Sequence, residues 1–77
     1  MNNFVKVIIS RKIEDNPSFD TDVVINLGNI TMCEPEDKGY TKVYLTSGEH
    51  LVIRIQYENF INFIEQSSGA RLIKFED

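Results

Sequence analysis

The stretch KVYLTSGEHLVI, residues 42–53, constrains the fold more than any other part of this chain. Two runs that alternate apolar and polar residues flank a short Thr-Ser-Gly connection, which predicts a β-hairpin. A two-residue loop made of Ser47 and Gly48 would leave both faces of the hairpin mixed. A three-residue loop, 46–48, with Gly48 in the left-handed position of a type I turn plus bulge, places Val43 opposite Leu51.

The second register separates the two faces of the hairpin. One face is apolar and carries Val43, Leu45, Leu51, Ile53 and Ile55, whereas the other carries Tyr40, Lys42, Tyr44, His50, Val52 and Arg54. A slip of one residue exchanges every side chain between the faces. Because each fully buried aliphatic side chain stabilises the fold by about 1.5–3 kcal/mol, we expect burial to select the three-residue loop.

An amphipathic helix is expected directly after the hairpin. Its apolar positions recur at i, i+3, i+4 and i+7, and are Tyr57, Phe60, Ile61 and Ile64. Phe63 lies at the edge of this stripe, and Gly69 is suited to the position just after the last turn. A helix of about three turns is marginal in water, so we expect it to dock on the apolar face of the hairpin.

Four other runs have the composition of strands. They cover residues 4–9, 23–26, 30–34 and 71–75, the last as a possible edge strand. Pro35 ends the third run, Leu27 to Asn29 form a tight bend, and the polar stretch 11–22 is predicted to be a loop that turns at Asn16 and Pro17. The sequence therefore predicts an α+β fold in a single domain, 1–77, with a mainly antiparallel sheet of four to five strands and one principal C-terminal helix packed on one face.

Composition limits the function classes. A chain of 77 residues buries only about 60% of the surface that it exposes when unfolded, so a second subunit would add useful core. The net charge of −4 disfavours general affinity for nucleic acids or anionic membranes, because phosphate binding needs clustered cations. The apolar run at residues 4–9 is too short for a membrane span. The single cysteine, Cys33, cannot form an internal disulfide, so the cytoplasm is the expected location.

Cys33 and His50 are the candidates for nucleophilic catalysis, but nothing in their spacing predicts a hydrogen bond between them. We expect Cys33 to be a packing residue and His50 to be a solvated residue on a strand. No phosphate-binding glycine loop or zinc-type cysteine pair is present in the sequence. The sequence therefore predicts no enzymatic activity, no cofactor and no metal.

The polar face of the hairpin is the candidate binding surface, and its residues are Tyr40, Lys42, Tyr44, His50 and Arg54. The simplest interpretation is a set of cross-strand aromatic and cation–aromatic pairs on a solvated face. A protein interface is a second, since Tyr and Arg are favoured anchors. A third is binding of single-stranded nucleic acid through stacked bases and bound phosphates. If the strand after Pro35 lies at a sheet edge, symmetric pairing of two copies through it is the simplest dimer.

Three segments between Val23 and Glu65 carry a family resemblance: VINLGNITMCEP, YTKVYLTSGEHLVI and YENFINFIEQ. Together they resemble the core of LytTR-type domains and of the small FlbD-like flagellar proteins. The matching positions are mainly core and turn residues, namely Leu27, Ile30, Glu34, Val43, Leu45, Gly48, Val52, Phe60, Ile61 and Ile64. The basic, histidine-containing stretch of LytTR domains has no counterpart in SSGARLIKFED, so the resemblance does not imply DNA binding.

The FlbD-like proteins are small stand-alone chains, and this resemblance implies an accessory or regulatory role. The function expected from the sequence is a non-enzymatic protein-interaction or accessory module that self-associates as a homodimer or binds a protein partner. The alternative is a nucleic-acid-binding transcriptional regulator that uses Tyr40, Lys42, Tyr44 and Arg54.

Overall fold

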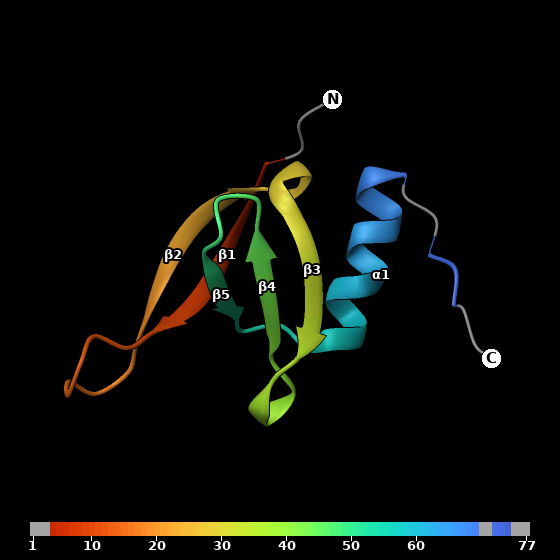
Figure 1. Ribbon diagram of the computed structural model, residues 1–77. Helices are drawn as coiled ribbons and strands as arrows, with labels where there is room; N and C mark the ends of the chain where they lie inside the picture. The colour runs from red at the N-terminus through yellow and green to blue at the C-terminus, as the bar shows by residue number, and fades with distance from the viewer. Residues whose placement is uncertain (1–3, 70–71, 75–77) are drawn as a thin grey trace.

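The computed structural model describes residues 4–69 and 72–74. Five strands and one α-helix follow one another along the chain, with two short 3-10 turns between strands. Their bounds are β1 Phe4–Arg11, β2 Phe19–Asn26, η1 Leu27–Asn29, β3 Ile30–Pro35, η2 Asp37–Gly39, β4 Thr41–Leu45, β5 His50–Ile53 and α1 Tyr57–Ser68. The strands form one antiparallel sheet in the order β2-β1-β5-β4-β3 (Figure 1). The α+β prediction is confirmed.

The β4–β5 hairpin has the predicted register. Val43 lies opposite Leu51, and Tyr44 lies opposite His50. The Gly48 N–H donates to the Leu45 carbonyl at 2.9 Å, and Gly48 has a φ of 92°, which a side chain would strain. The loop is therefore a three-residue connection with a bulge at Gly48, and the apolar residues of both strands share one face.

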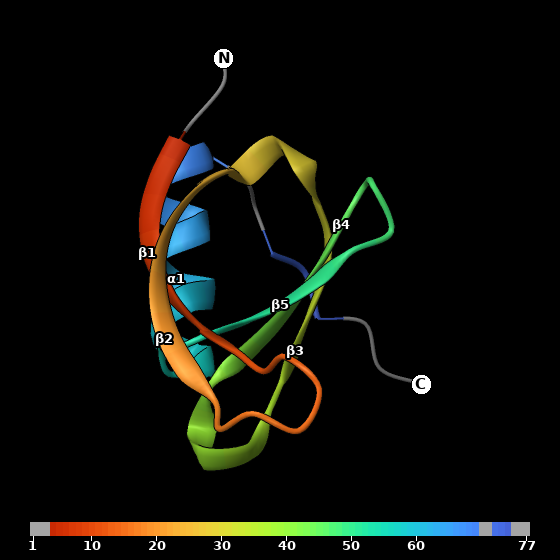
Figure 2. The same cartoon turned by 90° about the vertical axis from the view of Figure 1, so that its left-hand side faces the viewer.

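Helix α1 covers this apolar face, as the sequence predicted. Figures 1 and 2 show the helix on one side of a twisted sheet, whose other side carries no helix within the described residues. Phe60 is fully buried and belongs to one core cluster with residues from five other elements: Val7, Ile9, Ile25, Leu27, Val43 and Ile53. Phe63, at the edge of the stripe, is 37% exposed. The helix ends at Ser68, and the following Gly69 has a φ of 71°, which places it in the left-handed region.

The connection from β5 to α1 is held by a buried hydroxyl. Thr41 lies on the core side of β4 and is completely buried, and its hydroxyl donates to the Ile55 carbonyl at 2.8 Å. A buried hydroxyl without a partner would cost free energy, so this bond both satisfies Thr41 and fixes where the chain leaves the sheet.

The first hairpin is longer than predicted. Strand β1 continues to Arg11, and β2 begins at Phe19 rather than at residue 23, so the polar loop covers only 12–18. Asp20 and Asp22 were expected in that loop, but they lie on β2, opposite Ser10 and Ile8. Their low strand propensity is offset by cross-strand pairing with β1 and by ion pairs on the solvated side of the sheet.

The strand order bears on two sequence-based predictions about the sheet edges. The strand after Pro35 is β4, which lies between β3 and β5, so it offers no edge for a symmetric dimer. Pro35 itself is the last residue of β3, an edge strand, where a missing N–H is tolerated. The expected final strand, 71–75, lies partly outside the described residues, and residues 72–74 belong to no strand.

The packing of α1 predicts unequal effects for two phenylalanines on the same helix. Phe60→Ala should lower the free energy of unfolding by about 3–5 kcal/mol, because it leaves a cavity in the core. Phe63→Ala is the matched control and should cost at most about 2 kcal/mol, since part of its ring is already in water. Urea unfolding followed by circular dichroism measures both. Equal losses in the two variants would contradict the packing described here.

Candidate functional site: the tyrosine face

The five candidate residues lie together on the side of the sheet opposite α1. Tyr40, Lys42, Tyr44, His50 and Arg54, here called the tyrosine face, come from β4, β5 and the residues that adjoin them. They alternate with the buried Thr41, Val43 and Ile53, which point to the core. The register therefore brings the whole predicted set onto one surface, with His50 and Arg54 exposed and the other three half-buried.

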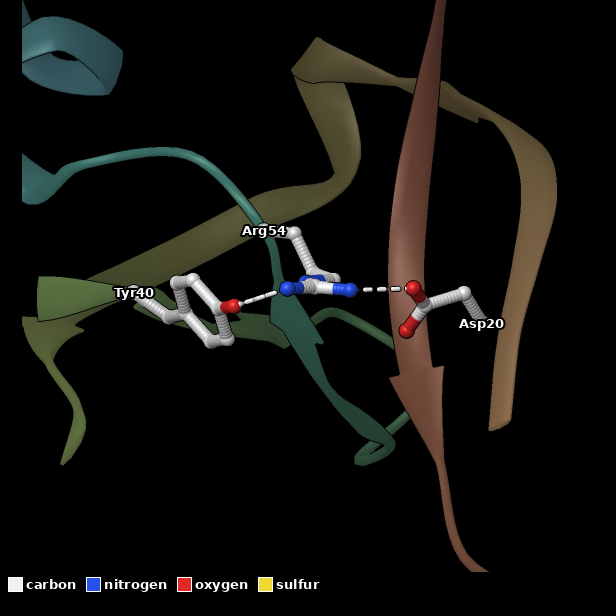
Figure 3. Close-up of polar contacts among 3 residues, drawn as sticks. All are labelled: Asp20, Tyr40 and Arg54. Carbon is white, nitrogen blue, oxygen red and sulfur yellow. Dashed lines mark hydrogen bonds and ion pairs between the residues drawn. The ribbon is translucent and has the colours of Figure 1, made fainter. Parts of the chain in front are cut away.

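Arg54 is held between two side chains, one on each side of it (Figure 3). Its Nε donates to the Tyr40 hydroxyl at 2.8 Å, and its guanidinium also forms an ion pair with Asp20 of β2. The guanidinium carbon lies 4.9 Å from the centre of the Tyr40 ring. The hydrogen bond to Tyr40, followed by that to Asp20, raises the pKa of Arg54 above its ordinary value. Arg54 therefore stays charged and connects β2 with Tyr40, which precedes β4, along the same face of the sheet.

Tyr44 is fixed by a second set of contacts. Its hydroxyl donates to Glu34 Oε1 at 2.7 Å, its ring centre lies 6.0 Å from that of His50, and Lys42 Nζ lies 5.4 Å from the Tyr44 ring centre. Glu34 lies directly opposite Lys42 in the β3–β4 register. Carboxylates therefore lie beside the cations and tyrosines of this face. Hydrogen bonds within the chain hold the Tyr40 and Tyr44 rings in place.

Sequence reasoning missed the two carboxylates of this site. Asp20 was predicted to lie in the loop 11–22, and Glu34 was predicted only as the last residue of the strand run 30–34, with no partner. Asp20 is 34 residues from Arg54 along the chain, so only the pairing of β1 with both β2 and β5 brings the two together. The sequence FDTDVVIN contained a signal for β2, because Asp20 and Asp22 alternate with neutral residues. Residues two apart share one face of a strand, so this pattern is typical of a strand with one solvated face.

Shallow hollows border the tyrosine face where β1 ends. One has a volume of about 340 Å³, and its lining includes Arg11, Lys12 and Lys38 as well as Glu36 and Asp37. Lys38 has a φ of 64°, an uncommon conformation for a residue other than glycine. The hollow combines both signs of charge, so it does not favour an anionic ligand strongly.

Cys33 and His50 lie on opposite sides of the sheet. Cys33 pairs with Val43 and packs against the core, whereas His50 pairs with Tyr44 on the tyrosine face. Burial raises the pKa of the Cys33 thiol, which is the opposite of what activates a nucleophilic cysteine. The Cys–His pair considered from sequence is not formed.

Among residues 4–69 and 72–74, no group of three or more His, Cys, Asp or Glu side chains lies close enough together to hold a metal ion. Within the same part of the chain, no helix has the length and apolar character needed to cross a membrane.

Comparisons with protein-family models, curated proteins and solved structures find no match to this chain. The resemblance to LytTR-type and FlbD-like domains stays a prediction.

The environment of Cys33 predicts a pH-dependent reactivity. Because the thiolate reacts and burial disfavours it, iodoacetamide should modify Cys33 in the native protein more slowly than in the urea-unfolded chain at the same pH. The midpoint of the rise of the native rate with pH should lie above that of the unfolded chain, which should be near the ordinary value of about 8.5. Mass spectrometry of quenched samples measures both rates. A native rate that matches or exceeds the unfolded one would contradict the burial of this thiol.

Proposed function

We propose that this protein is a non-enzymatic interaction module that binds protein through the outer side of its sheet and also self-associates. The observation that carries this proposal is the continuity of the tyrosine face with exposed apolar residues. Strand β1 lies next to β5, and the Arg54 N–H donates to the Ile8 carbonyl at 2.9 Å, so Ile8 adjoins the tyrosine face directly.

Three large apolar side chains on the outer side of β1 and β2 are unusually exposed. Phe4 is 64% exposed, Ile8 is 48% exposed, and Val24 is 63% exposed. Val24 lies opposite Lys6 and is the diagonal neighbour of both Phe4 and Ile8 on β1, so the three form a V-shaped apolar stripe around Lys6. An apolar stripe beside Tyr and Arg side chains has the composition of a protein interface, in which these residue types supply most of the binding energy.

The internal contacts of the tyrosine face support binding without rearrangement. The Tyr40 and Tyr44 hydroxyls are already hydrogen-bonded to Arg54 and Glu34, respectively. Side chains that are ordered in the free protein lose less conformational entropy when a partner binds. The FlbD-like resemblance supports an accessory or regulatory role for such a module, and its single cysteine is consistent with action in the cytoplasm.

Nucleic-acid binding is the second candidate, because Arg11, Lys12 and Lys38 line a hollow beside Tyr40. Stacked bases on the tyrosines with phosphates on these cations would resemble a single-strand binder. The nearby carboxylates count against it, since Asp20 pairs with Arg54, and Glu34 lies opposite Lys42. Repulsion of phosphates by these groups would offset the attraction of the cations.

The protein-interaction proposal predicts that partner capture depends on the outer side of the sheet. A double variant, Ile8→Ser with Tyr44→Ala, should lower the amount of captured partner at least about tenfold relative to the wild type. Interface anchors of this kind dominate affinity. Affinity purification from an extract of the source cells, with quantitative mass spectrometry, measures the loss. A matched double variant of exposed helix residues, Asn62→Ala with Glu65→Ala, should bind as the wild type does. Equal loss in both variants, or in neither, would contradict the proposed surface.

The two candidate functions differ in their response to salt. We expect no binding of a single-stranded oligonucleotide at an ionic strength of about 50 mM. Fluorescence anisotropy with labelled DNA and RNA of mixed sequence tests this. Binding that weakens steeply with salt, and that weakens further in a Lys42→Ala, Arg54→Ala variant, would instead support the nucleic-acid candidate.

A further inference from the structure

Strand β2 is an edge of the sheet that is regular over its whole length, and its charged residues are Asp20 and Asp22. It has eight residues and contains neither proline nor lysine. Figure 2 views the molecule from the side of β2 and shows no described element in front of it. An edge strand of this length presents a row of unpaired N–H and C=O groups, which is a template for another strand.

The register shows which β2 residues present those groups. The Arg54 N–H donates to the Ile8 carbonyl, so the peptide groups of Ile8 point toward β5. Successive residues of a strand point their peptide groups to alternate sides, so those of Val7 and Ile9 point toward β2. Their partners, Val23 and Thr21, therefore point back toward β1. The β2 residues that alternate with Thr21 and Val23 point their peptide groups to the open edge. These residues are Asp20, Asp22, Val24 and Asn26.

The opposite edge, β3, differs in three ways. Pro35 closes one end, the register with β4 shifts between Ile30 and Met32, and the Thr31 hydroxyl between them donates to the Tyr44 carbonyl at 3.2 Å. A bulge and a proline are the devices that discourage edge-to-edge pairing. The two edges of one sheet are thus unequal, and, as far as residues 4–69 and 72–74 show, β2 is the edge that is open over its whole length.

We propose that β2 pairs antiparallel with β2 of a second copy of this chain, so that one continuous sheet crosses a two-fold axis. This inference rests on the self-association in the proposed function and names the surface that performs it. A two-fold axis perpendicular to the sheet brings identical strands together and keeps both apolar core faces on one side.

The residues of β2 complement themselves in this arrangement. When the pairing centres on Val23, Asp22 lies opposite the partner subunit's Val24, and Asp20 lies opposite the partner subunit's Asn26. Every residue with an outward peptide group then finds a partner, and no two acidic side chains are directly opposed. Shifting the centre to Asp22 would oppose two carboxylates, which is destabilising, so charge disfavours that register.

Charge complementarity across the axis supports a second copy as the occupant. Lys6 lies opposite Val24 and forms an ion pair with Asp22 of its own chain at 3.8 Å. In the dimer, Val24 lies opposite the partner subunit's Asp22, about 10 Å from Lys6 across two strand spacings, within reach of the two side chains. Each Lys6 would therefore lie between two carboxylates, and the apolar stripes of the two copies would meet beside them.

The proposal predicts a dimer that a single exposed substitution on β2 weakens. Light scattering at protein concentrations up to about 1 mM should show the wild type approaching twice its mass of 8.9 kDa. Val24→Asp should raise the dimer dissociation constant at least about tenfold, since the new carboxylate opposes the partner's Asp22. The new residue lies opposite Lys6 of its own chain, so the β1–β2 hairpin should still form.

Met32→Asp is the matched control, because it adds the same charge at an exposed position of the other edge strand and should leave the dimer unchanged. A wild type that stays monomeric, or a dimer that responds equally to both substitutions, overturns the proposal. Amide hydrogen exchange gives an independent readout, in which protection of Asp22 and Val24 should increase with protein concentration. If the protein is a monomer but its capture of a partner still depends on Ile8 and Tyr44, the β2–β2 dimer is contradicted. Protein binding through the outer side of the sheet would still be supported.

Discussion

The burial of Phe60 against one face of the sheet is the contact on which the rest of this structure depends. A helix of this length is marginal in water, and a small sheet cannot cover its own apolar face. Phe60 joins Ile9, Val43 and Ile53, which come from three neighbouring strands, in a single core. Because this core uses one face only, the opposite face of every strand remains at the surface.

The solvated side of the sheet is organised by side-chain contacts between strands, some close in sequence and one across 34 residues. Arg54 connects Asp20 on β2 with Tyr40 beside β4, and Tyr44 is bonded to Glu34 on β3. These contacts satisfy the polar groups of the face and hold its rings in fixed positions. They also bring carboxylates among the cations, which is why protein binding is favoured over nucleic-acid binding as the proposal for this surface.

The asymmetry of the two sheet edges follows from the same topology. Strand β3 combines a proline with a bulge, whereas β2 is regular and fully paired with β1 on its inner side. The condition set for a dimer through the strand after Pro35 is not met, because β5 and β3 enclose β4. The open edge belongs to a strand whose acidic residues had appeared to mark a loop, and a small one-sided core is the kind that gains from a second subunit.

The sequence by itself determined the β4–β5 register and the helix, because both depend on patterns within a few residues. Only one register places Val43 with Leu51 on an apolar face, and only one helix face carries Phe60 and Ile64. The order of the strands, the partners of Arg54 and the separation of Cys33 from His50 were decided by the tertiary structure. Asp20 meets Arg54 across 34 residues of chain, and no local pattern specifies which distant strands become neighbours.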